Sequence, residues 1–232
     1  MTRGYVLGIA MMGIAATISG AQPVASEVVT FGSEGPPLIY VVMGDSTAAG
    51  VGGSYESGIA VSTARDLGKR FRVTMTNVAV SGARVRDVRR NQLADAEGLK
   101  PDVVLLSVGA NDVTHLTRIG SMRADLRTIV QRLKAVNPAV KIVLTGSPDM
   151  GSPPRIPRIL RGIASCRTKK VNRMFEAEAA QQRLIFAPIA AETGPLFRSD
   201  RSLFAEDRFH PNNRGYATWL PVLTKAIDQA LR

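Results

Sequence analysis

The chain has 232 residues, of which 45% are hydrophobic and 21% are charged, and its formal net charge is +11. This length and apolar content suit one domain with a sizeable core and exclude a disordered or fibrous chain. The positive charge favours contact with an anionic surface. Aromatic residues make up only 5% of the chain and no nucleic-acid-binding motif accompanies the charge, which argues against nucleic acid as the partner.

The N-terminal segment has the pattern of a secretory signal peptide. A short positive start ending at Arg3 precedes an uncharged apolar stretch over 6–18, and small residues occupy 19–21. The apolar stretch is roughly 13 residues long, which is short for the ~20 residues that cross a bilayer. We therefore predict a signal peptide over 1–21 and a secreted or periplasmic protein without a transmembrane segment in the mature chain, with a retained anchor as the alternative.

The rest of the chain alternates between strand and helix patterns. After a Gly/Pro-rich linker over 22–37, one domain is predicted over 38–232. Strands are expected at 38–43, 72–80, 102–108, 141–145 and 184–187. Helices are expected at 57–71, 85–96, 122–136, 171–182 and 214–231. This alternation predicts a parallel sheet with helices on both faces, which binds ligands beyond the carboxyl ends of its strands.

Two polar segments far apart in the sequence supply the side chains of a serine hydrolase. Ser46 follows the first expected strand in the sequence Gly44-Asp45-Ser46, and Asp207 precedes His210 by three positions. At this spacing one turn can place the carboxylate against the imidazole, which then accepts the proton of a serine hydroxyl. The other histidine, His115, lacks such a partner and is interpreted as a residue of the surface or of the surroundings of the site.

Two further segments at expected strand ends can stabilise an oxyanion. Gly82 follows the second strand and leaves its backbone N–H open to a ligand, because it has no Cβ. Asn111 follows the third strand and can donate its side-chain N–H at the same sheet edge. By contrast, Asp45 is interpreted as a structural carboxylate that bonds to local backbone, and Asp112 as one that holds a loop in place.

In this order, the segments of Ser46, Gly82, Asn111 and His210 resemble the four blocks of the SGNH hydrolase superfamily, also called GDSL esterases/lipases. The resemblance runs from about residue 38 to residue 231, which is nearly the whole predicted mature chain. It implies an α/β fold, namely a flavodoxin-like three-layer α/β/α sandwich with a five-stranded parallel sheet in the order 2-1-3-4-5. Thr47 departs from the family, in which leucine is common at this position.

The resemblance also implies ester hydrolysis through an acyl-enzyme, without a metal or cofactor. Ser46 would be the nucleophile, His210 the base and Asp207 the residue that orients it. The oxyanion hole would combine the backbone N–H groups of Ser46 and Gly82 with the Asn111 amide. The apolar side chains near Asp207 and His210 either line an acyl pocket or anchor their loop: Phe197, Leu203, Phe204 and Phe209.

These inferences predict a secreted serine esterase whose partner is a small-molecule or lipid ester. An acyltransferase with the same catalytic set remains an alternative, as does a non-catalytic envelope- or glycan-binding module. The sequence gives neither the acyl-chain length nor the oligomeric state. Arginine and lysine residues gather at 84–90 and at 155–170, where a solvated basic face is the simplest interpretation. The only cysteine, Cys166, cannot form an internal disulfide and is interpreted as an idle thiol.

Overall fold

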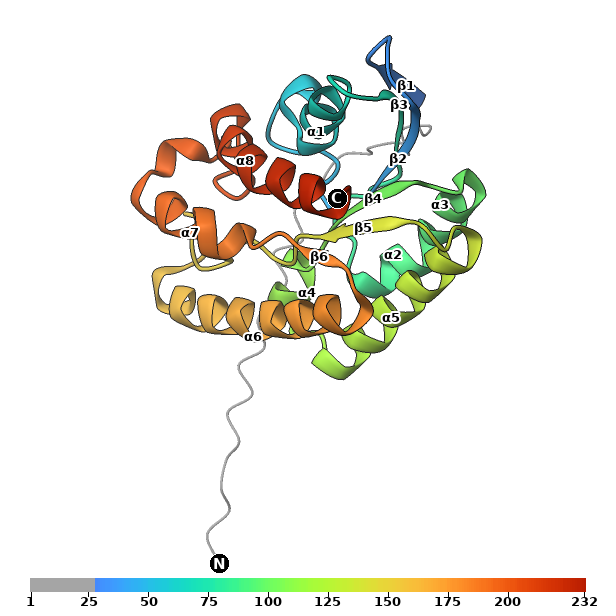
Figure 1. Cartoon of the computed structure of the whole chain (residues 1–232). Coiled ribbons are helices and arrows are strands. Elements are labelled where there is room, and N and C mark those ends of the chain that lie inside the picture. Colours follow the sequence, from blue (N-terminus) through green and yellow to red (C-terminus); the bar gives the residue numbers. More distant parts are fainter. Residues whose placement is uncertain (1–27) are drawn as a thin grey trace, which may run out of the picture.

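A six-stranded sheet forms the centre of the molecule in the computed structural model, which describes residues 28–232 (Figure 1). The predicted signal peptide lies outside the described residues. The strands are β1 (Val28–Phe31), β2 (Pro37–Gly44), β3 (Arg72–Asn77), β4 (Val103–Ser107), β5 (Lys141–Leu144) and β6 (Ile185–Phe186). Their order is β1-β3-β2-β4-β5-β6, and β2 to β6 are parallel.

The five parallel strands confirm the predicted order 2-1-3-4-5, since β2 to β6 correspond to the five expected strands. The predicted number of strands was wrong, because β1 pairs antiparallel with β3 at the sheet edge. Val28–Phe31 lies inside the segment 22–37 that was predicted as a linker. Its residues are alternately exposed and half-buried, so the strand lacks the continuous apolar run of the buried strands.

Eight α-helices accompany the sheet in the described part of the chain. They are α1 (Ile59–Leu67), α2 (Val85–Asn91), α3 (Leu93–Leu99), α4 (Ala110–Thr114), α5 (Ile119–Val136), α6 (Arg158–Gln182), α7 (Ile189–Ser199) and α8 (Asn213–Ala230). The helix predicted over 85–96 is divided into α2 and α3 at Gln92. The helix predicted over 171–182 is the second half of α6, while α4 and α7 were not predicted.

Two hydrophobic cores lie on the two faces of the sheet. Alternate residues of β2 face opposite sides: Tyr40 and Val42 pack with α1, α7 and α8, whereas Val41 and Met43 pack with α2, α3, α5 and α6. Figure 1 shows these two groups of helices on opposite sides of the sheet. The fold is therefore the predicted three-layer sandwich. No helix within residues 28–232 is long and apolar enough to span a membrane.

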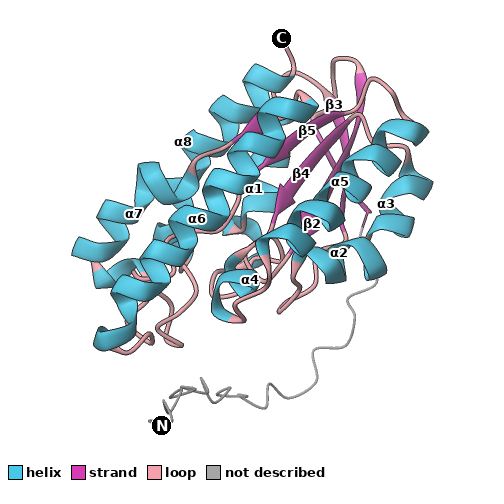
Figure 2. Cartoon of the chain, turned by 90° about the horizontal axis from the view of Figure 1, so that it is seen from below, coloured by secondary structure: helices cyan, strands magenta, loops and turns pink. Residues whose placement is uncertain are grey.

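The parallel strands bring their carboxyl ends to one edge of the sheet. In Figure 2 the arrows of β2 and β4 run side by side toward the loops near α4. Backbone pairing places Gly44 at the end of β2 opposite Ser107 at the end of β4. The segments that follow these strands therefore start from neighbouring points, which is where ligands bind in open α/β sheets.

Candidate active site

Ser46 lies in a tight turn immediately after β2. Gly44 has a φ of +145°, and a Cβ there would lie 1.8 Å from the Ser107 carbonyl oxygen, so only glycine fits. The Asp45 N–H donates to the same carbonyl at 3.0 Å. The chain then coils through hydrogen-bonded turns, in which the Val51 N–H donates to the Ser46 carbonyl at 2.9 Å. These contacts fix Ser46 at the sheet edge.

The Gln92 side chain binds the same strand end, which the sequence did not predict. Its side-chain Nε2 donates to the Gly44 carbonyl at 2.8 Å, and its Oε1 accepts from the Gly44 N–H at 2.9 Å. Gln92 is buried and occupies the break between α2 and α3. A glutamine that satisfies a distant backbone group leaves no local sequence pattern by which it can be recognised.

Asp207, His210 and Ser46 form a continuous hydrogen-bonded chain. His210 Nε2 lies 2.9 Å from Ser46 Oγ, and its Nδ1 lies 2.5 Å from Asp207 Oδ2. The other oxygen of Asp207 accepts the backbone N–H groups of Phe209 and His210 at 2.9 and 3.0 Å. Burial tends to raise the pKa of Asp207, but hydrogen bonds from His210 and Phe209 and the charge of His210 outweigh it, so this pKa lies below its usual value.

The loop that carries His210 approaches the Ser46 turn closely. A Cβ on Gly52 would lie 2.6 Å from the Pro211 carbonyl oxygen and 2.8 Å from the Cβ of His210. The His210 carbonyl accepts the Ala205 N–H at 2.8 Å, which closes the loop on itself. Because Gly52 has no side chain, the imidazole can lie within hydrogen-bond distance of Ser46.

Three groups near these side chains have an N–H that makes no hydrogen bond with any described residue. The backbone N–H groups of Ser46 and Gly82 have no partner among the described residues. Gly82 has a φ of +82°, and the space over its Cα is open. The Asn111 Nδ2 donates one hydrogen to the Ala83 carbonyl at 3.1 Å, which places the amide next to Gly82. Its second hydrogen is left available to a ligand.

A match to a known family agrees with this arrangement. Residues 42–218 match the GDSL-like lipase/acylhydrolase family, which is the resemblance predicted from the four segments. The chain belongs to this family. GDSL-like esterase Rv1075c of Mycobacterium tuberculosis is 33% identical over 196 residues. The match covers 82% of this chain and 62% of the esterase, so the chain spans less than two thirds of the length of this curated relative.

Solved structures with the same fold include Axe2 and TesA. Axe2, an acetylxylan esterase from Geobacillus stearothermophilus, is 20% identical with a TM-score of 0.67, over 83% of this chain and 95% of that chain. TesA is also 20% identical, with a TM-score of 0.66, over 83% of this chain and 99% of that chain. At this level of identity, the likeness establishes the fold of the GDSL-like chain.

The remaining predicted polar residues of this GDSL-like chain contact the scaffold. Asp45 Oδ1 accepts the N–H and the hydroxyl of Thr47 at 3.0 and 2.8 Å, and burial raises the Asp45 pKa to about 6. Asp112 Oδ2 accepts the Val85 N–H at 3.0 Å and so joins α4 to α2. His115 is exposed and bonds to the Asn111 carbonyl. The structural interpretations of Asp45 and Asp112 therefore agree with their contacts.

A pocket opens beside Ser46 and His210, and its walls are largely apolar. It encloses about 470 Å³ of empty volume, part of which is open to solvent. The large apolar side chains in its lining are Met150, Phe197, Phe204, Phe209 and Trp219. Three of the four predicted pocket residues thus line it. Leu203 does not line the pocket and is buried in the core that α8 forms with the sheet, in agreement with the alternative that it anchors the loop.

The loop 146–157 forms one wall of the pocket, and the buried carboxylate of Asp149 holds it in place. Asp149 accepts hydrogen bonds from the hydroxyls of Ser152 and Ser165 at 2.8 Å and from Arg198 Nε at 2.7 Å. Burial tends to raise its pKa, but these bonds outweigh burial and lower it. The loop is therefore fastened to both α6 and α7. The sequence predicted an irregular loop here, without the residue that fixes it.

No group of three or more histidine, cysteine, aspartate or glutamate side chains within residues 28–232 is arranged to hold a metal ion. The arrangement that is present has a hydroxyl bonded to an imidazole, the imidazole bonded to a carboxylate, and N–H groups available nearby. Such a set can transfer a proton from the hydroxyl and bind a negatively charged oxygen.

Proposed function

We propose that this protein is a serine esterase that hydrolyses a carboxylic ester through an acyl-enzyme. The observation that carries the proposal is the hydrogen-bonded chain from Asp207 through His210 to Ser46 Oγ, with spacings of 2.5 and 2.9 Å. A serine hydroxyl becomes a useful nucleophile when an oriented base takes its proton. Membership of the GDSL-like lipase/acylhydrolase family supports the same conclusion.

The proposed reaction gives each of these residues a defined role. His210 takes the proton of Ser46 as Oγ attacks the ester carbonyl, and Asp207 holds the imidazole and stabilises its positive charge. The backbone N–H groups of Ser46 and Gly82 and the Asn111 amide bind the oxyanion. His210 then gives the proton to the leaving alcohol. Water, activated by the same base, releases the acid and restores Ser46.

The pocket suggests that the acyl group is of modest size. Its lining suits an apolar acyl group, and the bulky rings of Phe197, Phe204, Phe209 and Trp219 form its walls. Short aliphatic, aryl and acetyl esters therefore fit better than long-chain lipids. The fold relative Axe2 is described as an acetylxylan esterase, which makes an O-acetylated sugar one substrate to include in tests of this chain.

The test is hydrolysis of p-nitrophenyl esters from acetyl to dodecanoyl by the purified protein. We expect activity that disappears in Ser46→Ala and in His210→Ala and that is highest on short chains. A wild-type rate equal to that of Ser46→Ala at every chain length would reject the esterase and favour a non-catalytic envelope- or glycan-binding module.

An acyltransferase would use the same residues, since an alcohol can replace water in the second step. The two reactions separate when glycerol or a sugar is added to the assay. Free acid as the main product supports hydrolysis, whereas an ester of the added alcohol supports transfer.

We further propose that the protein is exported. The sequence pattern over 1–21 supports a cleaved signal peptide, and N-terminal sequencing of protein recovered outside the cytoplasm tests it. A first residue of Gln22 is the expected result. A membrane-bound product that still begins at Met1 would instead support a retained anchor.

A further inference from the structure

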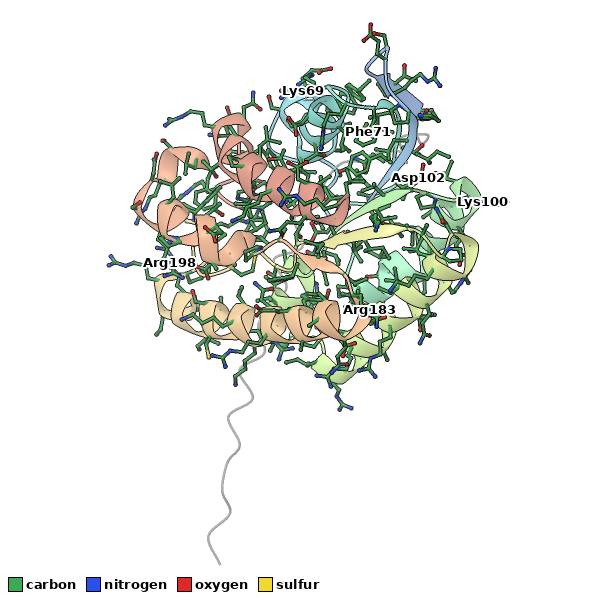
Figure 3. The ribbon with its side chains drawn as sticks, in the orientation of Figure 1. Lys69, Phe71, Lys100, Asp102, Arg183 and Arg198 are labelled. Carbon is green, nitrogen blue, oxygen red and sulfur yellow. The ribbon has the colours of Figure 1, made fainter. Side chains whose placement is uncertain are left out.

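A second hollow, which we call the basic hollow, opens between α6 and α7. It lies beside the pocket at Ser46 and His210, which we call the catalytic pocket. The basic hollow is open to solvent, which makes up part of its empty volume of about 720 Å³, and Arg161, Lys169 and Arg198 line it. Arg198 lies on α7 close to the first half of α6 (Figure 3). The catalytic pocket and the basic hollow meet at Ser152, which lines both. Three cations therefore lie next to the catalytic pocket.

The two arginines of the basic hollow are held in place by the protein itself. Arg161 Nε and Nη2 donate to the carbonyls of Ile156 and Pro154 at 2.9 and 3.1 Å. Arg198 Nε donates to Asp149 Oδ2 at 2.7 Å. In both arginines Nη1 makes no hydrogen bond with another described residue. Because these side chains are already ordered, a ligand would lose little conformational entropy in binding them.

Lys169 adds a charge that no described residue neutralises. Its ammonium group makes no hydrogen bond or ion pair within residues 28–232, and no acidic side chain among the described residues lines the basic hollow. The positive charge of Arg198 is offset by its ion pair with Asp149. Two cations, Arg161 and Lys169, therefore remain uncompensated in one concave site, and such a site attracts an anion.

We propose that the basic hollow binds a phosphate group carried by the ester substrate, while the acyl group occupies the catalytic pocket. Phosphate suits the site because its several oxygens can accept from guanidinium and ammonium groups that approach from different directions. The proposal rests on the proposed esterase function and adds a substrate class, namely acyl esters of phosphorylated alcohols.

The first experiment measures binding without catalysis. Calorimetry on the Ser46→Ala protein compares decyl phosphate, below its micelle concentration, with decanol and with inorganic phosphate. We expect decyl phosphate to bind more tightly than either, and Lys169→Gln to weaken its affinity by about tenfold, the value of one charge-assisted hydrogen bond. Lys170→Gln is the matched control, because Lys170 is an exposed lysine on the same helix that does not line the hollow.

Equal affinities in the Lys169→Gln and Lys170→Gln proteins would overturn the site. Inorganic phosphate binding as tightly as decyl phosphate would show that the hollow takes free phosphate, and would overturn the assignment to the substrate. If the wild-type protein hydrolyses no ester but decyl phosphate binds in a Lys169-dependent way, the esterase function fails and the phosphate site stands.

The second experiment measures selectivity as a ratio, which a general loss of folding or catalysis does not change. We expect Lys169→Gln to lower the ratio of kcat/KM for hexanoyl glycerol phosphate to that for hexanoyl glycerol by about tenfold. Lys170→Gln should keep the wild-type ratio. A ratio that is the same in wild type and Lys169→Gln would overturn the proposal.

Discussion

His210 Nε2 lies 2.9 Å from Ser46 Oγ, although the two residues are 164 positions apart in the sequence. In the proposed mechanism neither side chain can attack an ester without the other, so we expect the pair to act as one unit. Ser46→Ala and His210→Ala should each lower kcat/KM on p-nitrophenyl butyrate by about 10⁴-fold or more, and the double variant should lose no more than either. Ser121→Ala, an exposed serine on α5, is the control. A loss of kcat/KM in the double variant equal to the product of the two single losses would contradict a shared role.

Asp207 is expected to act through the orientation of His210. In Asp207→Asn the side-chain amide can present an N–H₂ group to the imidazole Nδ1, which favours the wrong tautomer. We expect kcat/KM to fall by about 10²- to 10⁴-fold, while the melting temperature changes little because this side chain is 35% exposed. The neighbouring carboxylate gives the contrast: Asp45→Asn should lower kcat/KM far less. Equal losses in the two variants would reject the assignment of Asp207 as the orienting acid.

Asn111 is expected to contribute mainly to the transition state. Removing one donor from an oxyanion hole typically lowers kcat by about 10²- to 10³-fold, and Asn111→Ala should show this loss with KM nearly unchanged. Because the amide also bonds to the Ala83 carbonyl, thermal unfolding should be recorded beside the kinetics. A rise in KM with kcat preserved would mean that Asn111 binds the ground state of the substrate instead.

The central strands could be predicted from the sequence because burial on both faces leaves continuous apolar runs. The missed elements lack that signal. The first half of α6 places Ile159 and Ile163 on the surface, with 86% and 57% of each exposed, so no apolar face points to a helix there. In α7, Gly194 and Pro195 occupy the middle of the helix, and both residues are typical helix breakers.

The sequence predicted those parts of the candidate site whose residues form local motifs. Asp207 and His210 are three positions apart, and the four family segments occur in a fixed order. Gln92 and Asp149 were missed because Gly44, the partner of Gln92, and Arg198, the ion-pair partner of Asp149, lie 48 and 49 positions away in the sequence. For Leu203 the sequence left pocket and core open, since its distance from His210 in the sequence does not reveal which side of the loop faces the core.

Asp45 is expected to make the stability of the protein depend on pH. Burial raises its pKa to about 6 from 3.8, so the folded state binds more protons than the unfolded state between these values. The contribution of Asp45 to the free energy of unfolding therefore decreases as the pH rises from about 4 to 6, by roughly 3 kcal/mol in all. Asp45→Asn removes this titration and keeps an oxygen that can accept from Thr47.

Urea unfolding of the wild type and of Asp45→Asn at pH 4.5 and pH 7.5 tests the effect. The free energy of unfolding of the variant, relative to the wild type, should be higher at pH 7.5 than at pH 4.5. A difference between the two proteins that is independent of pH would contradict the raised pKa of Asp45.

Phe197 is expected to limit the length of the acyl group, because it lines the catalytic pocket and packs edge-on against Phe204 at a centroid distance of 5.1 Å. Phe197→Leu should open this wall and move the preferred p-nitrophenyl ester toward longer chains. Phe175→Leu is the matched control, since Phe175 is a buried aromatic residue that does not line the pocket. Both changes should lower the free energy of unfolding by up to about 3 kcal/mol. Only Phe197→Leu should alter the ratio of kcat/KM between octanoyl and butyryl esters, and a similar shift in Phe175→Leu would show that Phe197 does not set the acyl-chain preference.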